Sequence, residues 1–133
     1  MNEVRTATCR CGQLTATVTG DPIRISVCHC LDCQRRSGSS FAAQARFPVD
    51  QVTISGETTM WTKVGDNGAA TDFHFCPTCG GNVFYRGGGF PDLIAVAIGA
   101  FADPAFPPPQ YSVWEQRKHA WVTIVGDAVE HFG

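Results

Sequence analysis

The 133-residue sequence contains no long hydrophobic run and no large excess of either charge. Ten basic side chains oppose twelve acidic ones, and a formal net charge of -2 argues against a dedicated nucleic-acid binder, whose affinity depends on neutralising phosphates. The longest apolar stretch, Leu93–Ile98, is about a third of the roughly 20 residues that a membrane-spanning helix needs. The N-terminal residues lack the apolar core of a signal peptide. The sequence therefore predicts a cytoplasmic protein that binds neither nucleic acid nor membrane.

Hydrophobic residues make up 44% of the chain and charged residues 17%, a composition that excludes a disordered linker. A domain of this length buries roughly two-thirds of the surface of its unfolded chain, so it needs neither metal nor disulfides merely to collapse. We expect one domain over residues 1–133, with its core in about residues 5–125. No feature of the sequence predicts an oligomeric state.

Apolar and polar side chains alternate along much of the chain. In Gln13–Thr19, the residues Leu14, Ala16 and Val18 fall on one face, a period of two that is typical of a strand with one buried side. Ile23–Val27 repeats this pattern. Further strands, with glycine and proline in the breaks between them, are predicted at Ser40–Phe47, Val52–Ile54, Thr58–Lys63, Ala70–Phe75, Asn82–Arg86, Leu93–Ile98, Tyr111–Glu115 and Trp121–Val125.

Helix is expected at one place, His29–Arg36, with one further turn near Asp103. The proline-rich segment Asp103–Pro109 is interpreted as an extended crossover rather than a partner-binding polyproline motif. The glycines at 87–89 lack the strand–turn–helix context of a dinucleotide site and are interpreted as a loop. Many short strands and little helix predict a mainly β fold, either a sandwich or a barrel-like arrangement.

The seven cysteines form three tight groups: Cys9 and Cys11, then Cys28, Cys30 and Cys33, then Cys76 and Cys79. Cysteines used as small core hydrophobes would instead be scattered through the strands. Thiols stay reduced in the cytoplasm, so these residues are expected to be metal ligands or catalytic groups rather than a disulfide framework.

Spacing suggests how the groups divide between metal ions. Two thiolates separated by one or two residues can both reach one zinc ion at about 2.3 Å, so the first and third groups together complete a closed four-thiolate structural site. The second group then supplies three ligands and leaves a fourth position open, as in a catalytic zinc site. Spacing also permits another division, such as Cys28 and Cys33 with the third group.

Two alternatives remain for the cysteines. Cys76 and Cys79 have the spacing of a redox disulfide, although that motif usually opens a helix and here joins two predicted strands. Otherwise His29 or His119 closes the second site, which would make the protein a non-catalytic zinc-binding interaction module.

The ordered motifs CxCG, CHCxxCQRRSGSSFAA, FCPTCGGNVFYR, PDLIAVAIGAFADP and RKHAW extend from about Cys9 to Trp121. This pattern resembles the glutathione-dependent formaldehyde-activating enzyme family, which also includes centromere protein V. The resemblance implies an Mss4-like β-tent of antiparallel sheets stabilised by zinc. It also implies a carbon–sulfur lyase activity like that of S-(hydroxymethyl)glutathione synthase, with a small-molecule thiol and an aldehyde as partners.

The resemblance further implies two zinc ions per chain. The matching structural ligands are Cys9, Cys11, Cys76 and Cys79, and the matching catalytic ligands are Cys28, Cys30 and Cys33. Many family members have a histidine where this sequence has Ser112, and His119 lies instead two residues before Trp121.

Other side chains carry weaker expectations. Arg35, Arg36 and the serine-rich segment 37–40 are candidates for binding a substrate carboxylate beside the second group. His74 is expected to face solvent, and His131 to lie in a flexible tail. The aromatic residues expected to lie in the core or to line the β-tent, rather than to stack on a substrate, are Phe41, Phe47, Phe73, Phe75, Phe84 and Trp121.

Overall fold

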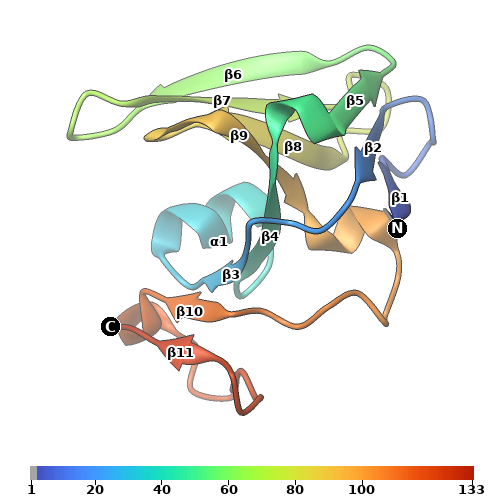
Figure 1. The fold of residues 1–133 in the computed structure, drawn as a ribbon. Coiled ribbons are helices and arrows are strands. Elements are labelled where there is room, and N and C mark those ends of the chain that lie inside the picture. The colour runs from blue at the N-terminus through green and yellow to red at the C-terminus, as the bar shows by residue number, and fades with distance from the viewer. Residues whose placement is uncertain (1–2) are drawn as a thin grey trace.

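The computed structural model describes residues 3–133, which contain two sheets and one short α-helix (Figure 1). The smaller sheet has the order β1 (Val4–Thr8), β2 (Thr15–Thr19), β5 (Val52–Ser55). The larger sheet has the order β11 (Glu130–His131), β10 (Tyr111–Val113), β3 (Arg24–Cys28), β4 (Ala42–Pro48), β9 (Phe90–Ala97), β8 (Asn82–Gly87), β7 (Ala70–Phe75), β6 (Thr59–Val64).

The helix α1 spans Leu31–Ser37, and the short 3-10 turns are η1 (Val49–Gln51), η2 (Ile98–Phe101) and η3 (Glu115–Arg117). Strands account for 44% of the chain and helix for 13%, so the predicted mainly β class is confirmed. Neighbouring strands are antiparallel, except that β10 pairs in parallel with both β3 and β11. No helix within residues 3–133 is long and apolar enough to cross a membrane.

The core lies between one face of the smaller sheet and the adjoining face of the larger sheet. Leu14, Ala16 and Val18 are fully buried, as the alternation predicts. Phe47 of β4 and Val96 of β9 are packed in the same cluster. Cys9 and Cys76 also belong to this cluster, so the loops that carry the first and third cysteine groups are anchored in the core.

Two expectations about the C-terminal half are wrong. Trp121–Val125 forms no strand, and both end residues lie largely in solvent, with Trp121 76% exposed. The segment borders a groove formed with Pro107, Pro108 and Pro109. Because proline has no backbone N–H, this neighbour offers few donors for a β ladder. Trp121 is therefore not a core residue, whereas Phe47 and Phe84 are.

Other boundaries differ by a few residues. The sequence analysis did not predict β1. The strand β10 ends at Val113, two residues earlier than predicted, because Trp114 adopts a left-handed φ of 58°. The helix α1 begins at Leu31 rather than His29, since the Cys30 side chain caps it by accepting a hydrogen bond from the Cys33 N–H. A turn near Asp103 is confirmed by the hydrogen bond from the Phe106 N–H to the Asp103 carbonyl at 3.0 Å.

The expectations that His74 faces solvent and that His131 lies in a flexible tail are both wrong. His131 lies in β11, and its Nδ1 is 2.7 Å from Glu115 Oε2, a contact that holds the pKa of Glu115 below its ordinary value. His74 is half-buried: its ring stacks on Phe84 at 4.4 Å, and its Nδ1 bonds to the Thr58 hydroxyl at 3.0 Å. Burial lowers the pKa of His74.

Candidate functional site

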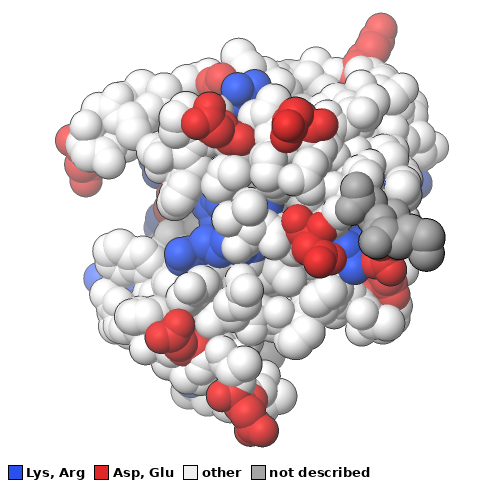
Figure 2. All heavy atoms as spheres, in the orientation of Figure 1, with Lys and Arg blue, Asp and Glu red and all other residues white. Residues whose placement is uncertain are grey.

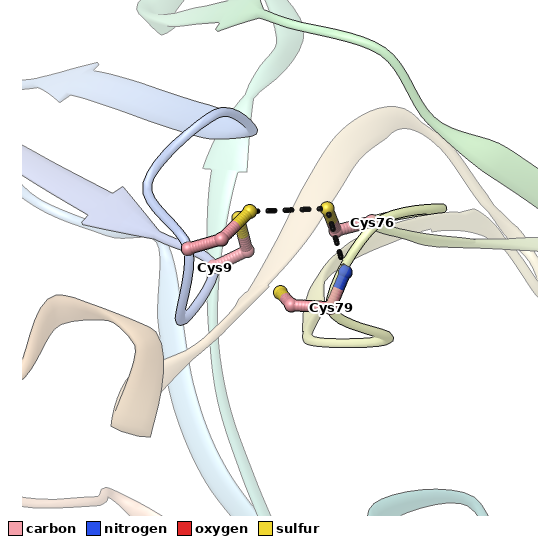
Figure 3. Close-up of side chains that lie close together, drawn as sticks. Cys9, Cys76 and Cys79 are labelled. Carbon is pink, nitrogen blue, oxygen red and sulfur yellow. Dashed lines mark hydrogen bonds between the residues drawn. The ribbon is translucent and has the colours of Figure 1, made fainter.

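The first and third cysteine groups meet in one cluster. The loop between β1 and β2 faces the loop between β7 and β8, and the sulfur atoms point toward one another (Figure 3). Cys9 Sγ is 3.6 Å from Cys11 Sγ, which is 3.7 Å from Cys76 Sγ. A tetrahedron with Zn–S bonds of about 2.3 Å has S–S edges of about 3.8 Å, whereas a disulfide bond measures about 2.0 Å. This cluster, completed by Cys79, therefore fits a tetrahedral thiolate site.

Local hydrogen bonds shape the cluster. The Gly12 and Gly80 N–H groups turn back to the Cys9 and Cys76 carbonyls, and both glycines have positive φ angles. Cys76 Sγ accepts hydrogen bonds from Gln13 Nε2 at 3.0 Å and from the backbone N–H groups of the following turn. Burial by itself raises the pKa of Cys76, but these donors lower it to about 6. The fold thus favours the thiolate, the form that binds metal.

Gln13 is a functional residue that the sequence analysis missed. Its Nε2 contacts both Cys76 Sγ and the Glu57 carbonyl, and its Oε1 accepts the Glu57 N–H. The side chain links three segments that are far apart in sequence. No local pattern signals this role, because it depends on a contact across 63 positions.

Replacing Gly56 with alanine is expected to disturb this arrangement. A Cβ there would lie 2.0 Å from the Gln13 carbonyl oxygen, at a φ of +98°. We expect Gly56→Ala to lower the free energy of unfolding by more than about 2 kcal/mol, because the clash adds to the backbone strain. We also expect it to speed the loss of metal to a chelator, because the clash would displace Gln13 from Cys76 Sγ. Urea unfolding and a colorimetric metal-release assay measure the two effects.

Gly68→Ala is the matched control. Gly68 has a φ of +84°, but no heavy atom lies within 4 Å of the position of a new Cβ. This variant is therefore expected to show only the left-handed backbone penalty of about 1–2 kcal/mol, with unchanged metal release. Equal metal release from the two variants would contradict the role assigned to the Gln13 contact.

The second cysteine group forms a separate cluster. Cys28 ends β3, Cys30 caps α1 and Cys33 lies in its first turn, and the three sulfur atoms are within 4.8 Å of one another. A hydrogen bond from Cys28, supported by Cys30 and by the charge of Arg36, lowers the pKa of Cys33 to about 5. The same hydrogen bond raises the pKa of Cys28. One negative charge is therefore readily held on this cluster even without metal.

Among residues 3–133, no histidine, aspartate or glutamate joins the three sulfur atoms. His29 is fully buried, and its Nε2 is 2.9 Å from the Ser112 hydroxyl. His119 Nε2 is instead 2.8 Å from Gln34 Oε1. The geometry thus disfavours closure of the second cluster by either histidine, and it separates this cluster from the third cysteine group.

Ser112 supports His29 from β10. The Ser112 hydroxyl also contributes to the lowered pKa of Glu115, after the larger effect of His131. His29 Nδ1 already has no hydrogen-bond partner among the residues that the structure describes. Ser112 is therefore the one polar partner of this buried ring in residues 3–133.

Ser112→Ala is expected to lower the free energy of unfolding by about 1–3 kcal/mol, because both nitrogens of a buried imidazole would then lack a partner. Urea unfolding monitored by circular dichroism measures the change. Ser39→Ala removes a hydroxyl from an exposed position and is expected to have little effect. A Ser112→Ala protein as stable as this control would contradict the interpretation of the His29–Ser112 contact.

A cavity of about 510 Å³ opens beside α1. Its lining residues are Asp32, Arg35, Arg36, Trp61, Phe73, Phe75 and Asn82. The Arg36 guanidinium lies over the rings of Phe73 and Tyr85, and its Nη2 is 3.8 Å from Cys33 Sγ. Figure 2 shows Lys and Arg side chains in the hollow between the layer of β6–β9 and the part of the molecule that contains α1 and β3. The cavity therefore joins an aromatic wall to a basic edge, where Arg36 also contacts Cys33.

The fold and the two clusters define a mainly β protein with two candidate thiolate metal sites. The family model for the glutathione-dependent formaldehyde-activating enzyme matches residues 4–117, and the chain belongs to this family. No curated protein matches the chain. A crystal structure of a Rhodobacter sphaeroides protein has the same fold, with a TM-score of 0.58 and 22% sequence identity over 77% of this chain and 91% of that chain.

Proposed function

We propose that the protein is a zinc-dependent carbon–sulfur lyase that forms or cleaves the adduct between a glutathione-like thiol and a small aldehyde such as formaldehyde. The proposal rests chiefly on one observation. Cys28, Cys30 and Cys33 lie within 4.8 Å of one another, and residues 3–133 add no histidine or carboxylate to them. Family membership supports glutathione and formaldehyde as substrates.

In this proposal each chain uses two zinc ions. The closed, structural site is formed by Cys9, Cys11, Cys76 and Cys79, and the catalytic site by Cys28, Cys30 and Cys33. Zinc bound at the second cluster supplies a Lewis acid that favours the thiolate form of a substrate thiol. Reduced cysteines of this kind suit the cytoplasm, where we place the protein.

The reaction conserves atoms and electrons. In the forward direction the substrate sulfur forms a bond to the aldehyde carbon, and the π bond of the carbonyl breaks. The proton lost by sulfur ends on the former carbonyl oxygen, so glutathione and formaldehyde give S-hydroxymethylglutathione with no further reactant. The reverse steps release the aldehyde.

Residues around the second cluster prepare this step. Arg36 is held on two aromatic rings and places its charge beside Cys33, where it stabilises negative charge on sulfur. Phe73, Phe75 and Trp61 give the cavity beside Arg36 an apolar wall. Arg35 lines the same cavity and is available to a substrate carboxylate.

Metal analysis with a chelator tests the proposal. Zinc-reconstituted protein is expected to hold two ions per chain, of which one is released quickly and is protected by added glutathione. Loss of this ion is expected to abolish thiol–aldehyde exchange while the circular dichroism spectrum remains unchanged. Two ions that are both released slowly and are indifferent to glutathione would support the alternative, a non-catalytic zinc-binding interaction module.

A further inference from the structure

Two arginines face each other across neighbouring strands of the larger sheet. Arg24 of β3 is the direct partner of Arg46 of β4 in the antiparallel register. Like charges in this position destabilise a sheet. Within residues 3–133, neither guanidinium belongs to an ion pair with a carboxylate. The fold therefore keeps together two positive charges that nothing in the described chain neutralises.

Aromatic and polar side chains hold these guanidinium groups without cancelling their charge. Arg24 lies 4.3 Å from the centre of the Tyr111 ring, and Arg46 lies 4.7 Å from that of Phe90. Arg46 also donates from Nη2 to the Tyr85 hydroxyl at 3.3 Å and from Nη1 to the Ser26 hydroxyl at 3.5 Å. Such supports fix the direction of a cation but leave it available to an anion.

The arginine pair shares a sheet face with the second cysteine cluster. Because side chains alternate along a strand, Arg24, Ser26 and Cys28 lie on the same face of β3. The four residue steps from Arg24 to Cys28 correspond to roughly 13 Å along the strand. On this face, Ala95 and Ala97 of β9 lie opposite Arg46 and Gln44, respectively. These alanines add no polar group to this face, so the polar contacts between the arginines and the cysteines come from Ser26 and Gln44.

One buried side-chain amide, that of Gln44, lies on this face between the arginines and the cysteines. Gln44 is only 4% exposed, and its Nε2 donates to the Ser26 hydroxyl at 2.8 Å. Its Oε1 has no hydrogen-bond partner in the described residues, and neither does Arg24 Nε. A buried acceptor and a buried donor without partners are costly in a folded protein. Gln44 lies opposite Ser26, between Arg24 and Cys28 along the sheet, so its free acceptor suits a ligand that carries both an N–H group and an anion.

We propose that Arg24 and Arg46 form a binding site for a carboxylate at the end of the substrate thiol that lies far from its sulfur. The inference rests on the proposed function, since it places the sulfur at Cys28, Cys30 and Cys33. Guanidinium groups bind carboxylates through paired N–H donors, which gives both affinity and direction. A peptide-like thiol of two or three residues, at up to about 3.5 Å per residue, spans much of the distance and brings an N–H to Gln44 Oε1.

Binding of S-methylglutathione to the zinc-loaded protein tests this site without any reaction. This probe keeps both carboxylates of glutathione but has no free thiol. Isothermal titration calorimetry is expected to show an affinity that is about 10- to 100-fold weaker in Arg24→Gln and in Arg46→Gln, because charge-assisted hydrogen bonds are lost. Arg86→Gln is the matched control: Arg86 is exposed, contacts the Pro91 carbonyl and lies on the other face of β8 from Tyr85.

Kinetics with two thiols add a second readout. In Arg24→Gln and Arg46→Gln, the KM for glutathione is expected to rise by a similar factor with kcat little changed, whereas rates with 2-mercaptoethanol, which has no carboxylate, stay at the level of the unmodified protein. Equal losses with both thiols, or unchanged binding of S-methylglutathione, would overturn the carboxylate site. Arg24→Lys and Arg46→Lys retain the charge, and we expect them to bind with intermediate affinity if the glutamine variants fail to fold.

The two proposals fail in different ways. Arginine-dependent binding of S-methylglutathione, without any acceleration of thiol–aldehyde exchange by the unmodified protein, would overturn the lyase function and support the carboxylate site. Exchange activity that is indifferent to both arginines would support the lyase function and overturn the carboxylate site.

Discussion

Replacing Cys76 with serine is expected to remove one zinc ion per chain and to lower Tm by more than about 15 °C, because a structural zinc site contributes directly to folding. Cys76 is fully buried in the hydrophobic core and is 3.7 Å from Cys11 Sγ. The cluster joins the loop after β1 to the loop after β7. Without Cys76, the two loops no longer provide a complete set of zinc ligands between them. Thermal unfolding with parallel metal analysis measures both effects.

Thr78→Ala is the control for Cys76→Ser. Thr78 is exposed in the same loop, and its contact with Cys76 Sγ comes from its backbone N–H, which alanine retains. We expect this variant to keep both ions and a Tm close to that of the unmodified protein. A Cys76→Ser protein with two zinc ions and a Tm near that of this control would contradict the assignment of a structural site.

Cys30→Ser should abolish turnover while leaving the fold intact. The Cys30 side chain caps α1 by accepting the Cys33 N–H at 3.3 Å, and serine is among the preferred N-cap residues. The substitution therefore keeps the helix start but removes one thiolate from the second cluster. We expect the rate of thiol–aldehyde exchange to fall by more than about 1,000-fold, since several kcal/mol of charge stabilisation would be lost.

Metal content and thermal unfolding accompany the rate measurement. The Cys30→Ser protein is expected to retain the zinc of the first cluster and a Tm within a few degrees of the unmodified protein, and the exposed-site variant Thr78→Ala to retain full activity. Substantial turnover by Cys30→Ser with only the first site occupied would show that the second cluster is not the site of reaction.

Some of the fold follows directly from sequence because one face of each strand is buried. The alternation of Leu14, Ala16 and Val18 marks β2 correctly, since all three side chains are fully buried. The strand β1 lacks such a signal, because Ala7 is its only buried residue. Trp121–Val125 has the β-branched composition of a strand but forms none, because composition does not reveal whether a partner strand exists.

The spacing of the cysteines indicates that each group binds within one region of space, but it leaves open which groups share an ion, and it is the structure that brings the first and third groups together. The residues that surround the cysteines were not predictable. Gln13 meets Cys76 across a long loop, Ser112 meets His29 across a parallel strand pair, and Arg24 meets Arg46 through strand register. Register depends on which strands pair and how they are offset, and single-strand patterns do not contain that information.

Exchange spectroscopy with carbon-13 formaldehyde and glutathione tests the central claim most directly. The account predicts that zinc-loaded protein, present at a small fraction of the substrate concentration, accelerates interconversion of free and thiol-bound formaldehyde in proportion to the zinc held by Cys28, Cys30 and Cys33. An exchange rate equal to that in buffer, measured on protein with both clusters fully loaded, would contradict it.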